Sequence, residues 1–235
     1  MRNSNSWLGS ASLHIIINNL SPLSIEIERN IMVDKYSNFE DLANSEIAGR
    51  DFVIKLACRE SKTLVIAPHA GAIEPGTSEI TLAIARDDTS YYLFEGVKEA
   101  GNGKLHITST NFDEPQALKI AASSDFTIAI HGEASDNEIV YLGGRNKALQ
   151  SQISASLKKA GFKVDKHTNS RLQGTSKENI CNRCASASGV QLELGKGLRK
   201  TFFKNLTPNG RKQITEELEK FTTAVRDGMN RVNSL

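Results

Sequence analysis

Leu64-Val-Ile-Ala67 and Phe126-Thr-Ile-Ala-Ile130 are continuous apolar runs of strand length, and they determine which architecture this chain can adopt. A strand without polar alternation is covered on both faces, so both runs are expected at the centre of a sheet. Similar segments alternate with amphipathic helical stretches, which predicts an α/β fold with a mixed, mostly parallel central sheet flanked by helices. The other predicted strands cover residues 91–95, 105–109, 139–142, 163–166 and 189–194, and the predicted helices 79–86, 115–123, 147–160 and 208–229.

The composition is that of a globular protein that folds without disulfides. Of 235 residues, 39% are hydrophobic and 24% are charged, which is enough apolar side chain for one substantial core. The formal net charge of +2 argues against a nucleic-acid binder, so any basic site must be local. Three cysteines exclude a disulfide framework and are typical of a reducing compartment. We expect cytoplasmic synthesis and a monomer that binds neither nucleic acid nor a membrane.

Residues 1–32 precede the region of clear patterning and are expected to form an N-terminal extension outside a single α/β domain at residues 33–235. The apolar stretch from Leu13 to Leu20 is interrupted by two asparagines and falls short of the ~20 residues that span a bilayer. No small-residue cleavage site follows it clearly, which weakens a signal-peptide interpretation. Without a secretory signal, the protein would leave the cell by lysis.

A histidine ends each of the two apolar strands. His69 is followed by Glu74, and His131 is followed by a glycine. In open α/β sheets, ligands bind beyond the carboxyl ends of the strands. Two imidazoles and one carboxylate match the protein ligands of a catalytic zinc site that keeps one position open. The alternative is that each histidine only caps its strand and bonds a backbone carbonyl. His14, His106 and His167 are interpreted as structural or solvent-facing.

A second acidic group lies in Val190-Gln-Leu-Glu-Leu194, which alternates apolar and polar residues. Gln191 and Glu193 therefore share one face of a predicted strand. If that face looks into the cleft, Glu193 is a general acid/base; otherwise it is an ordinary exposed strand residue. Lys196 and Arg199, just beyond, would help to hold an acidic substrate.

Cys181-Asn-Arg-Cys184 is a lone CxxC pair, and three cysteines cannot supply the second pair of a structural zinc site. A redox role is the alternative to two incidental thiols beside Asn182 and Arg183. Arg183 is the more informative residue, because a guanidinium binds a carboxylate with two hydrogen bonds.

Four blocks of the sequence resemble, in order, the phage-type poly-γ-glutamate hydrolases of bacteriophages and Bacillus genomes, often labelled phage-related replication proteins. The blocks are Pro68-His69-Ala-Gly-Ala-Ile-Glu74, Ile130-His131-Gly132, Asn179-Ile-Cys-Asn-Arg183, and Gly189-Val-Gln-Leu-Glu-Leu194 with Leu198-Arg199. The similarity covers residues 36–203. It implies a zinc carboxypeptidase-like α/β fold, a single bound zinc ion, and cleavage of the γ-amide bonds of poly-γ-glutamate.

The resemblance also implies a role for each matching residue. His69, Glu74 and His131 would bind the zinc ion, Glu193 would act as general acid/base, and Arg183 would contact the oxyanion or a substrate carboxylate. The substrate is a polyanion, so further cations should bind it. The candidates for substrate binding are Asn182, Arg145, Arg171, Lys196 and Arg199. Two other functions remain open: a non-enzymatic phage or prophage accessory protein, and a zinc amidase acting on cell-wall peptide.

Overall fold

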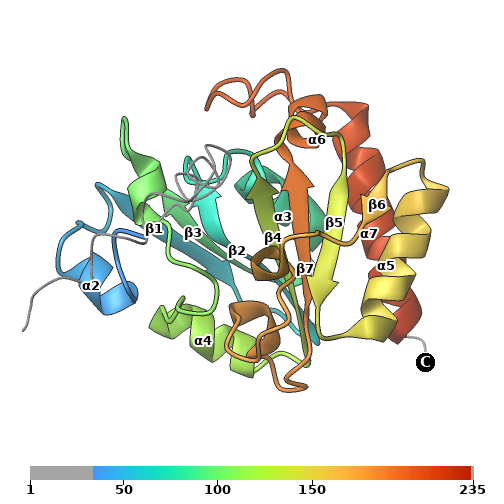
Figure 1. Ribbon diagram of the computed structural model, residues 1–235, viewed down its shortest axis with the longest axis horizontal. Coiled ribbons are helices and arrows are strands. Elements are labelled where there is room, and N and C mark those ends of the chain that lie inside the picture. The colour runs from blue at the N-terminus through green and yellow to red at the C-terminus, as the bar shows by residue number, and fades with distance from the viewer. Residues whose placement is uncertain (1–33, 234–235) are drawn as a thin grey trace, which may run out of the picture. The chain divides into compact units, whose positions relative to one another are not determined.

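The computed structural model describes residues 34–233, which contain a seven-stranded mixed sheet (Figure 1). The strand order is β1-β3-β2-β4-β7-β5-β6. Strands β3, β2, β4 and β7 are parallel neighbours, whereas β1 and β5 join them antiparallel and β6 is parallel to β5. The strands are β1 (Phe52–Ala57), β2 (Thr63–Gly71), β3 (Ser90–Gly96), β4 (Phe126–Glu133), β5 (Val140–Gly144), β6 (Val164–Asp165) and β7 (Val190–Gly195). The predicted fold class is therefore confirmed.

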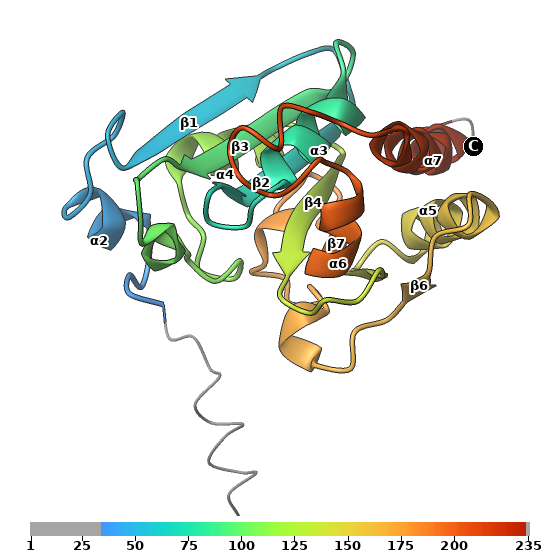
Figure 2. The ribbon, with the colours of Figure 1, turned by 90° about the horizontal axis from the view of Figure 1, so that it is seen from above.

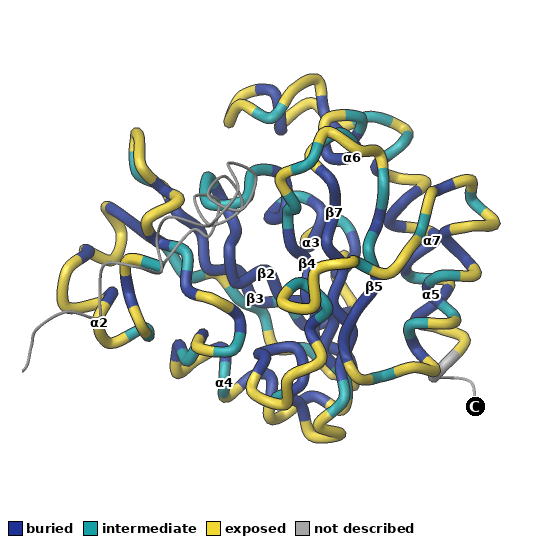
Figure 3. The backbone as a smooth tube through the Cα atoms, viewed as in Figure 1, coloured by how far each residue is buried: buried dark blue, intermediate teal, exposed yellow. Residues whose placement is uncertain are grey.

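The central strands are buried on both faces, as their apolar sequences predict (Figure 3). Every residue of β2 and of β7 is buried. Successive side chains of β2 enter two different clusters: Val65 packs in one, and Ile66 packs in the other. Because of this alternation, the same strands contribute side chains to two hydrophobic cores, one on each face of the sheet.

Two sets of helices cover the two faces of the sheet. The first core contains residues of α3 (Thr77–Ala85), α5 (Lys147–Lys159), α6 (Lys196–Thr201) and α7 (Glu216–Asn233). Figures 1 and 2 show α5 and α7 side by side beyond the β6 end of the sheet. The second core contains residues of α2 (Phe39–Ala43), α4 (Pro115–Ala122) and two short 3-10 turns, η2 (Asn102–Leu105) and η4 (Ile180–Asn182).

Local sequence explains where the helices begin and end. The side chain of Asn146 accepts a hydrogen bond from the backbone of Leu149 and caps α5. At its other end, Gly161 adopts the left-handed conformation, with φ of 88°, that stops a helix. Pro115 occupies the first turn of α4, where its missing N–H costs nothing.

The structure corrects two of the predicted elements and adds a strand that was not predicted. Residues 105–109 are not a strand: the end of η2 and an irregular segment replace it. The last helix begins at Glu216 rather than at residue 208. Strand β1 was not predicted, although five of its six residues are apolar and form a run of strand length.

Within residues 34–233, no helix is long and apolar enough to cross a membrane. The predictions for residues 1–32, including the stretch from Leu13 to Leu20 and the role of His14, lie outside the described residues.

Candidate metal and catalytic centre

His69 is aimed by an irregularity in β2. The pairing of β2 with β3 shifts between Ala67 and Ala70, and Pro68, which has no N–H to donate, lies in this gap. A β-bulge bends its strand and redirects the adjacent side chain. The His69 ring is buried, and its centroid lies 6.3 Å from that of Phe112, a residue of the second core.

The loop after β2 turns Glu74 back onto His69. The backbone N–H of Glu74 donates to the His69 carbonyl at 2.9 Å. Its carboxylate Oε1 lies 3.0 Å from His69 Nδ1, and Oε2 accepts from the backbone N–H of Gly132 at 2.8 Å. The carboxylate therefore bridges the ends of β2 and β4.

His131 reaches the same point from β4. Its Nδ1 lies 3.2 Å from His69 Nδ1 and 3.7 Å from Glu74 Oε2. Nε2 of the His131 ring lies 3.5 Å from Ser109 Oγ. The structure thus brings together the three residues that the sequence singles out as metal ligands.

The hydrogen bonds of His69 determine which nitrogen faces the cluster. Its Nε2 lies 2.8 Å from the carbonyl oxygen of Ile107, which only accepts, so Nε2 carries the proton. Burial, reinforced by the neighbouring His106, lowers the pKa of His69 to about 4. In this neutral ring, Nδ1 is an acceptor that faces the oxygen of Glu74. Two acceptors this close need a cation or a shared proton between them.

Glu193 lies next to His131 on the neighbouring strand. The two residues are paired in the parallel register of β4 and β7, so their side chains project from the same face. Burial raises the pKa of Glu193 to about 7, an effect that His131 opposes and that Glu74 reinforces. Gln191 lies on the same face and donates to Glu193 Oε1 at 2.8 Å. A carboxyl group that titrates near neutrality is suited to general acid/base chemistry.

His131 and Glu74 respond to the same charges in opposite directions. Burial favours the neutral form of the His131 ring, but the carboxylates of Glu193 and Glu74 outweigh it and raise its pKa. Burial also favours a neutral Glu74, but His69 and His131 hold its pKa well below the ordinary value. The cluster therefore holds one ionised carboxylate beside two imidazoles.

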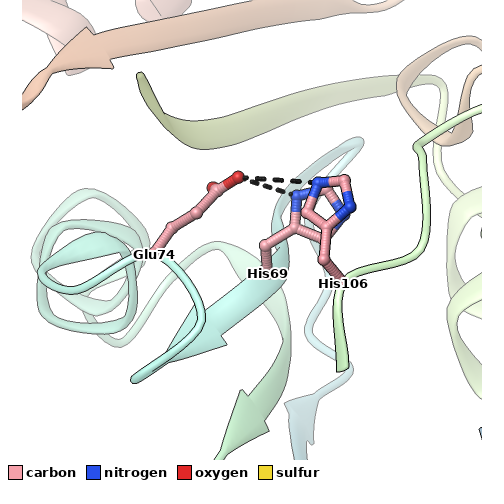
Figure 4. Close-up of side chains that lie close together, drawn as sticks. All are labelled: His69, Glu74 and His106. Atoms are coloured by element: carbon pink, nitrogen blue, oxygen red, sulfur yellow. Dashed lines mark hydrogen bonds and ion pairs between the residues drawn. The ribbon is translucent and has the colours of Figure 1, made fainter. Parts of the chain in front are cut away.

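His106 is a member of this cluster that the sequence interpretation missed. Its Nε2 lies 4.0 Å from Glu74 Oε1, and its ring centroid lies 3.9 Å from that of His69 (Figure 4). His69, Glu74 and His106 each offer one ligand atom within 4.8 Å of the others. The other ring nitrogen of His106, Nδ1, lies 2.6 Å from Oδ1 of Asp34. Burial raises the pKa of Asp34, but hydrogen bonds from His106 and Thr108 bring it down to about 2.

Arg199 connects the ends of β4 and β7 with the loop that follows β2. Its guanidinium is buried and donates only to backbone carbonyls: Nε to Leu194 at 3.1 Å, Nη1 to Pro75 at 2.6 Å and Nη2 to Glu133 at 2.8 Å. A Cβ on Gly132 would lie 2.7 Å from Arg199 Cζ, so only glycine leaves room for this arrangement. In the folded protein, the hydrogen bonds of Arg199 therefore stabilise the backbone around the site.

Replacing Arg199 by Met should lower the free energy of unfolding by about 3 kcal/mol, because three buried charge-assisted hydrogen bonds are lost at once. Urea unfolding followed by circular dichroism measures this change. Lys200→Met is the matched control: its ion pair with Asp136 is exposed to solvent, so losing it should leave the free energy of unfolding nearly unchanged. Equal stability of the two variants would show that the Arg199 hydrogen bonds have no structural role.

Asn182 ends η4 and Arg183 follows it, and both make other contacts in the described part of the chain. The Asn182 amide donates to the carbonyls of Gly174 and Ser176, both at 2.7 Å. Arg183 donates to the backbone carbonyl and carboxylate of Glu178, at 3.0 and 3.3 Å. These contacts fix the loop before η4, and substrate roles for both residues stay predictions.

Arg145, Arg171 and Lys196 are exposed, as residues that recruit an anionic substrate need to be.

Cys181 and Cys184 are buried free thiols. Burial raises the pKa of Cys181, which makes its reactive thiolate form rare.

The fold and the site together define a class: a mixed α/β protein with a histidine and carboxylate cluster at the carboxyl ends of its central parallel strands. Comparison with known proteins identifies the family within that class. A profile described as poly-gamma-glutamate hydrolase matches residues 36–224. This chain belongs to the poly-γ-glutamate hydrolase family, which is a family of enzymes.

Individual relatives agree with this assignment. The SPbeta prophage-derived protein YoqZ of Bacillus subtilis is 40% identical over 182 residues, which cover 77% of this chain and 66% of YoqZ. This chain thus spans just under two thirds of that relative. A structure of a bacteriophage poly-gamma-glutamate hydrolase superposes with a TM-score of 0.83 at 33% identity, covering 86% of this chain and 99% of that one. The zinc-free apo form of YndL gives a TM-score of 0.81 at 34% identity, covering 85% and 99% of the two chains.

Proposed function

We propose that this protein hydrolyses the γ-amide bonds of poly-γ-glutamate, using one zinc ion held by His69, Glu74 and His131. The observation that carries the proposal is the convergence of their side chains: Glu74 Oε1 lies 3.0 Å from His69 Nδ1, Glu74 Oε2 lies 3.7 Å from His131 Nδ1, and the two Nδ1 atoms lie 3.2 Å apart. Zinc bonds of about 2.0–2.2 Å in a tetrahedral site correspond to ligand atoms roughly 3.3 Å apart. The donor set and its spacing therefore fit a zinc ion.

The surroundings of the ligands support the same assignment. Metal-binding histidines usually engage their second nitrogen with a carbonyl or carboxylate, as His69 does with Ile107. Ligating imidazoles must be neutral, and the low pKa of His69 keeps it so at neutral pH. The name of the bacteriophage relative supports the substrate, and the zinc-free form of YndL supports the metal.

Glu193 is proposed as the general acid/base. A bound zinc ion would polarise the scissile carbonyl and lower the pKa of water at the site. The Glu193 carboxylate would accept the proton of the attacking water and pass it to the leaving amine. Its pKa of about 7 suits both transfers, and the hydrogen bond from Gln191 keeps the carboxylate on the side facing His131.

The substrate carries one α-carboxylate on each glutamate unit, so local cations would bind it. Lys196 follows the end of β7 directly and is exposed. Arg183 would have to leave Glu178 to contact an oxyanion or a substrate carboxylate. We propose Lys196 as a direct substrate contact, and Arg183 as one that forms only when substrate displaces Glu178.

Incubation with poly-γ-glutamate should shorten the polymer when one equivalent of zinc is present. Size-exclusion chromatography measures the chain length. A chelator should stop the reaction, and added zinc should restore it. α-Linked polyglutamate, which has the same charge but different amide bonds, is the control and should remain intact. Cleavage of cell-wall peptide with no cleavage of poly-γ-glutamate would contradict the proposal and identify an amidase of different specificity.

A further inference from the structure

Positive charge is concentrated in one part of this nearly neutral chain. Residues 139–177 contain eight Lys and Arg but only one acidic residue, Asp165, a formal charge of +7. Because the whole chain carries +2, the remainder carries −5. The eight basic residues are Arg145, Lys147, Lys158, Lys159, Lys163, Lys166, Arg171 and Lys177.

The fold gathers this segment at one edge of the sheet. It forms β5, α5, β6 and the short turn η3 (Ser170–Leu172), with α5 and β6 at the end of the sheet opposite β1 (Figure 1). All eight basic side chains are exposed. Within residues 34–233, none of them forms a salt bridge, whereas Arg199 and Arg183 are occupied by hydrogen bonds. The positive charge of this edge is therefore not neutralised by neighbouring carboxylates.

A groove of about 330 Å³ runs between α5 and the segment that follows β6. Lys147, Lys158 and Lys166 line it, and Gln150, Gln173 and Thr175 add amide and hydroxyl groups. Its one acidic lining residue is Asp165. Ammonium, amide and hydroxyl donors around a groove form a surface suited to carboxylates.

The turn η3, which is followed by the groove-lining Gln173, is hydrogen bonded to the catalytic face. Gln191, which donates to Glu193, also donates to the carbonyl of Leu172 at 3.2 Å. Leu172 follows Arg171 directly in η3. On the neighbouring strand, Tyr141 is the register partner of Glu193. The turn that carries Arg171 therefore lies beside the catalytic face, and the rest of the basic edge continues from it around β6 to α5, which packs against the opposite face of the sheet.

We propose that this basic edge, comprising Arg145, Lys147, Lys158, Lys166 and Arg171, binds the α-carboxylates of poly-γ-glutamate units beyond the bond being cleaved. The inference rests on the proposed function and specifies where the rest of the polymer lies. A polyanion is attracted to an uncompensated basic surface, and salt screens that attraction. The edge thus selects long polymers over short γ-glutamyl peptides.

The test removes three of these cations: Lys158→Gln, Lys166→Gln and Arg171→Gln in one protein. At low salt, the KM for long poly-γ-glutamate should rise about tenfold with kcat unchanged, as expected for three exposed ion pairs. High salt should remove the difference, and a γ-glutamyl tripeptide should show none. The matched control, Lys62→Gln with Lys119→Gln and Lys212→Gln, makes the same charge change at exposed lysines elsewhere. An unchanged KM, or an equal rise in the control, would overturn the proposal.

A binding measurement separates this inference from the proposed activity. Fluorescence anisotropy with labelled poly-γ-glutamate and zinc-loaded Glu193→Gln protein reports affinity without cleavage. If the triple variant in this background binds the polymer more weakly, the basic edge is a polymer-binding surface, even if the native protein proves unable to cut the polymer. Single-stranded DNA is the second probe: if the three substitutions weaken DNA binding but not polymer binding, the surface serves nucleic acid and the proposal is wrong.

Discussion

Glu193→Gln should reduce kcat on poly-γ-glutamate by about 10²–10⁴-fold while leaving zinc bound, because the amide keeps the size of the side chain but cannot accept the proton. The Glu193 side chain is buried on the same face as His131. Burial raises the pKa of its carboxyl group to about 7, so at neutral pH this group can both accept and donate a proton. Steady-state rates measure the loss, and metal analysis measures the zinc content.

Glu133→Gln is the matched control for this variant. Glu133 ends β4, and its carboxylate accepts hydrogen bonds from the backbone and hydroxyl of Ser135. The same chemical change there should leave kcat within a few-fold of the native value. Full activity of Glu193→Gln would remove Glu193 from the mechanism. Loss of zinc together with activity would instead assign it a role in holding the metal.

His131→Ala should weaken zinc binding at least about 10²-fold and abolish turnover, because it removes a ligand rather than a supporting contact. Competition with a chromophoric chelator measures the zinc affinity. His69→Ala should have the same effect, since His69 Nδ1 is the atom that both Glu74 and His131 approach most closely.

His106→Ala provides the decisive comparison, because His106 also faces Glu74. We expect zinc to remain bound in this variant, with an affinity reduced less than in His131→Ala. His167→Ala is the control: this ring packs against Tyr141 rather than against Glu74 and should not affect zinc. If His106→Ala loses zinc and His131→Ala keeps it, then His106 is the third ligand and the proposed set is wrong.

The sequence predicts this site well where its geometry follows from strand periodicity. Parallel strands end at the same edge of a sheet, so two apolar strands that each end in a histidine bring His69 and His131 together. Alternation along β7 likewise places Gln191 and Glu193 on one face, where they are hydrogen bonded. In these cases a pattern of a few residues is enough, because the backbone determines where the side chains point.

Features that depend on contacts distant in sequence could not be predicted. His106 owes its orientation to Asp34, 72 residues earlier, and its own alternating neighbours suggested a strand instead. Arg199 was expected to bind substrate, but one of its carbonyl partners, Pro75, is 124 residues away. Nothing local distinguishes a cation that faces solvent from one that is buried against backbone oxygens. Strand β1 is different: its sequence, Phe52-Val-Ile-Lys-Leu-Ala57, carries the apolar signal of a strand and could have been predicted.

The most direct test of the central claim is anomalous diffraction at the zinc absorption edge from crystals of the zinc-loaded protein. The account predicts one strong peak about 2.0–2.2 Å from His69 Nδ1, His131 Nδ1 and an oxygen of Glu74. A peak bound to His106 in place of His131, or bound away from these residues, would contradict it.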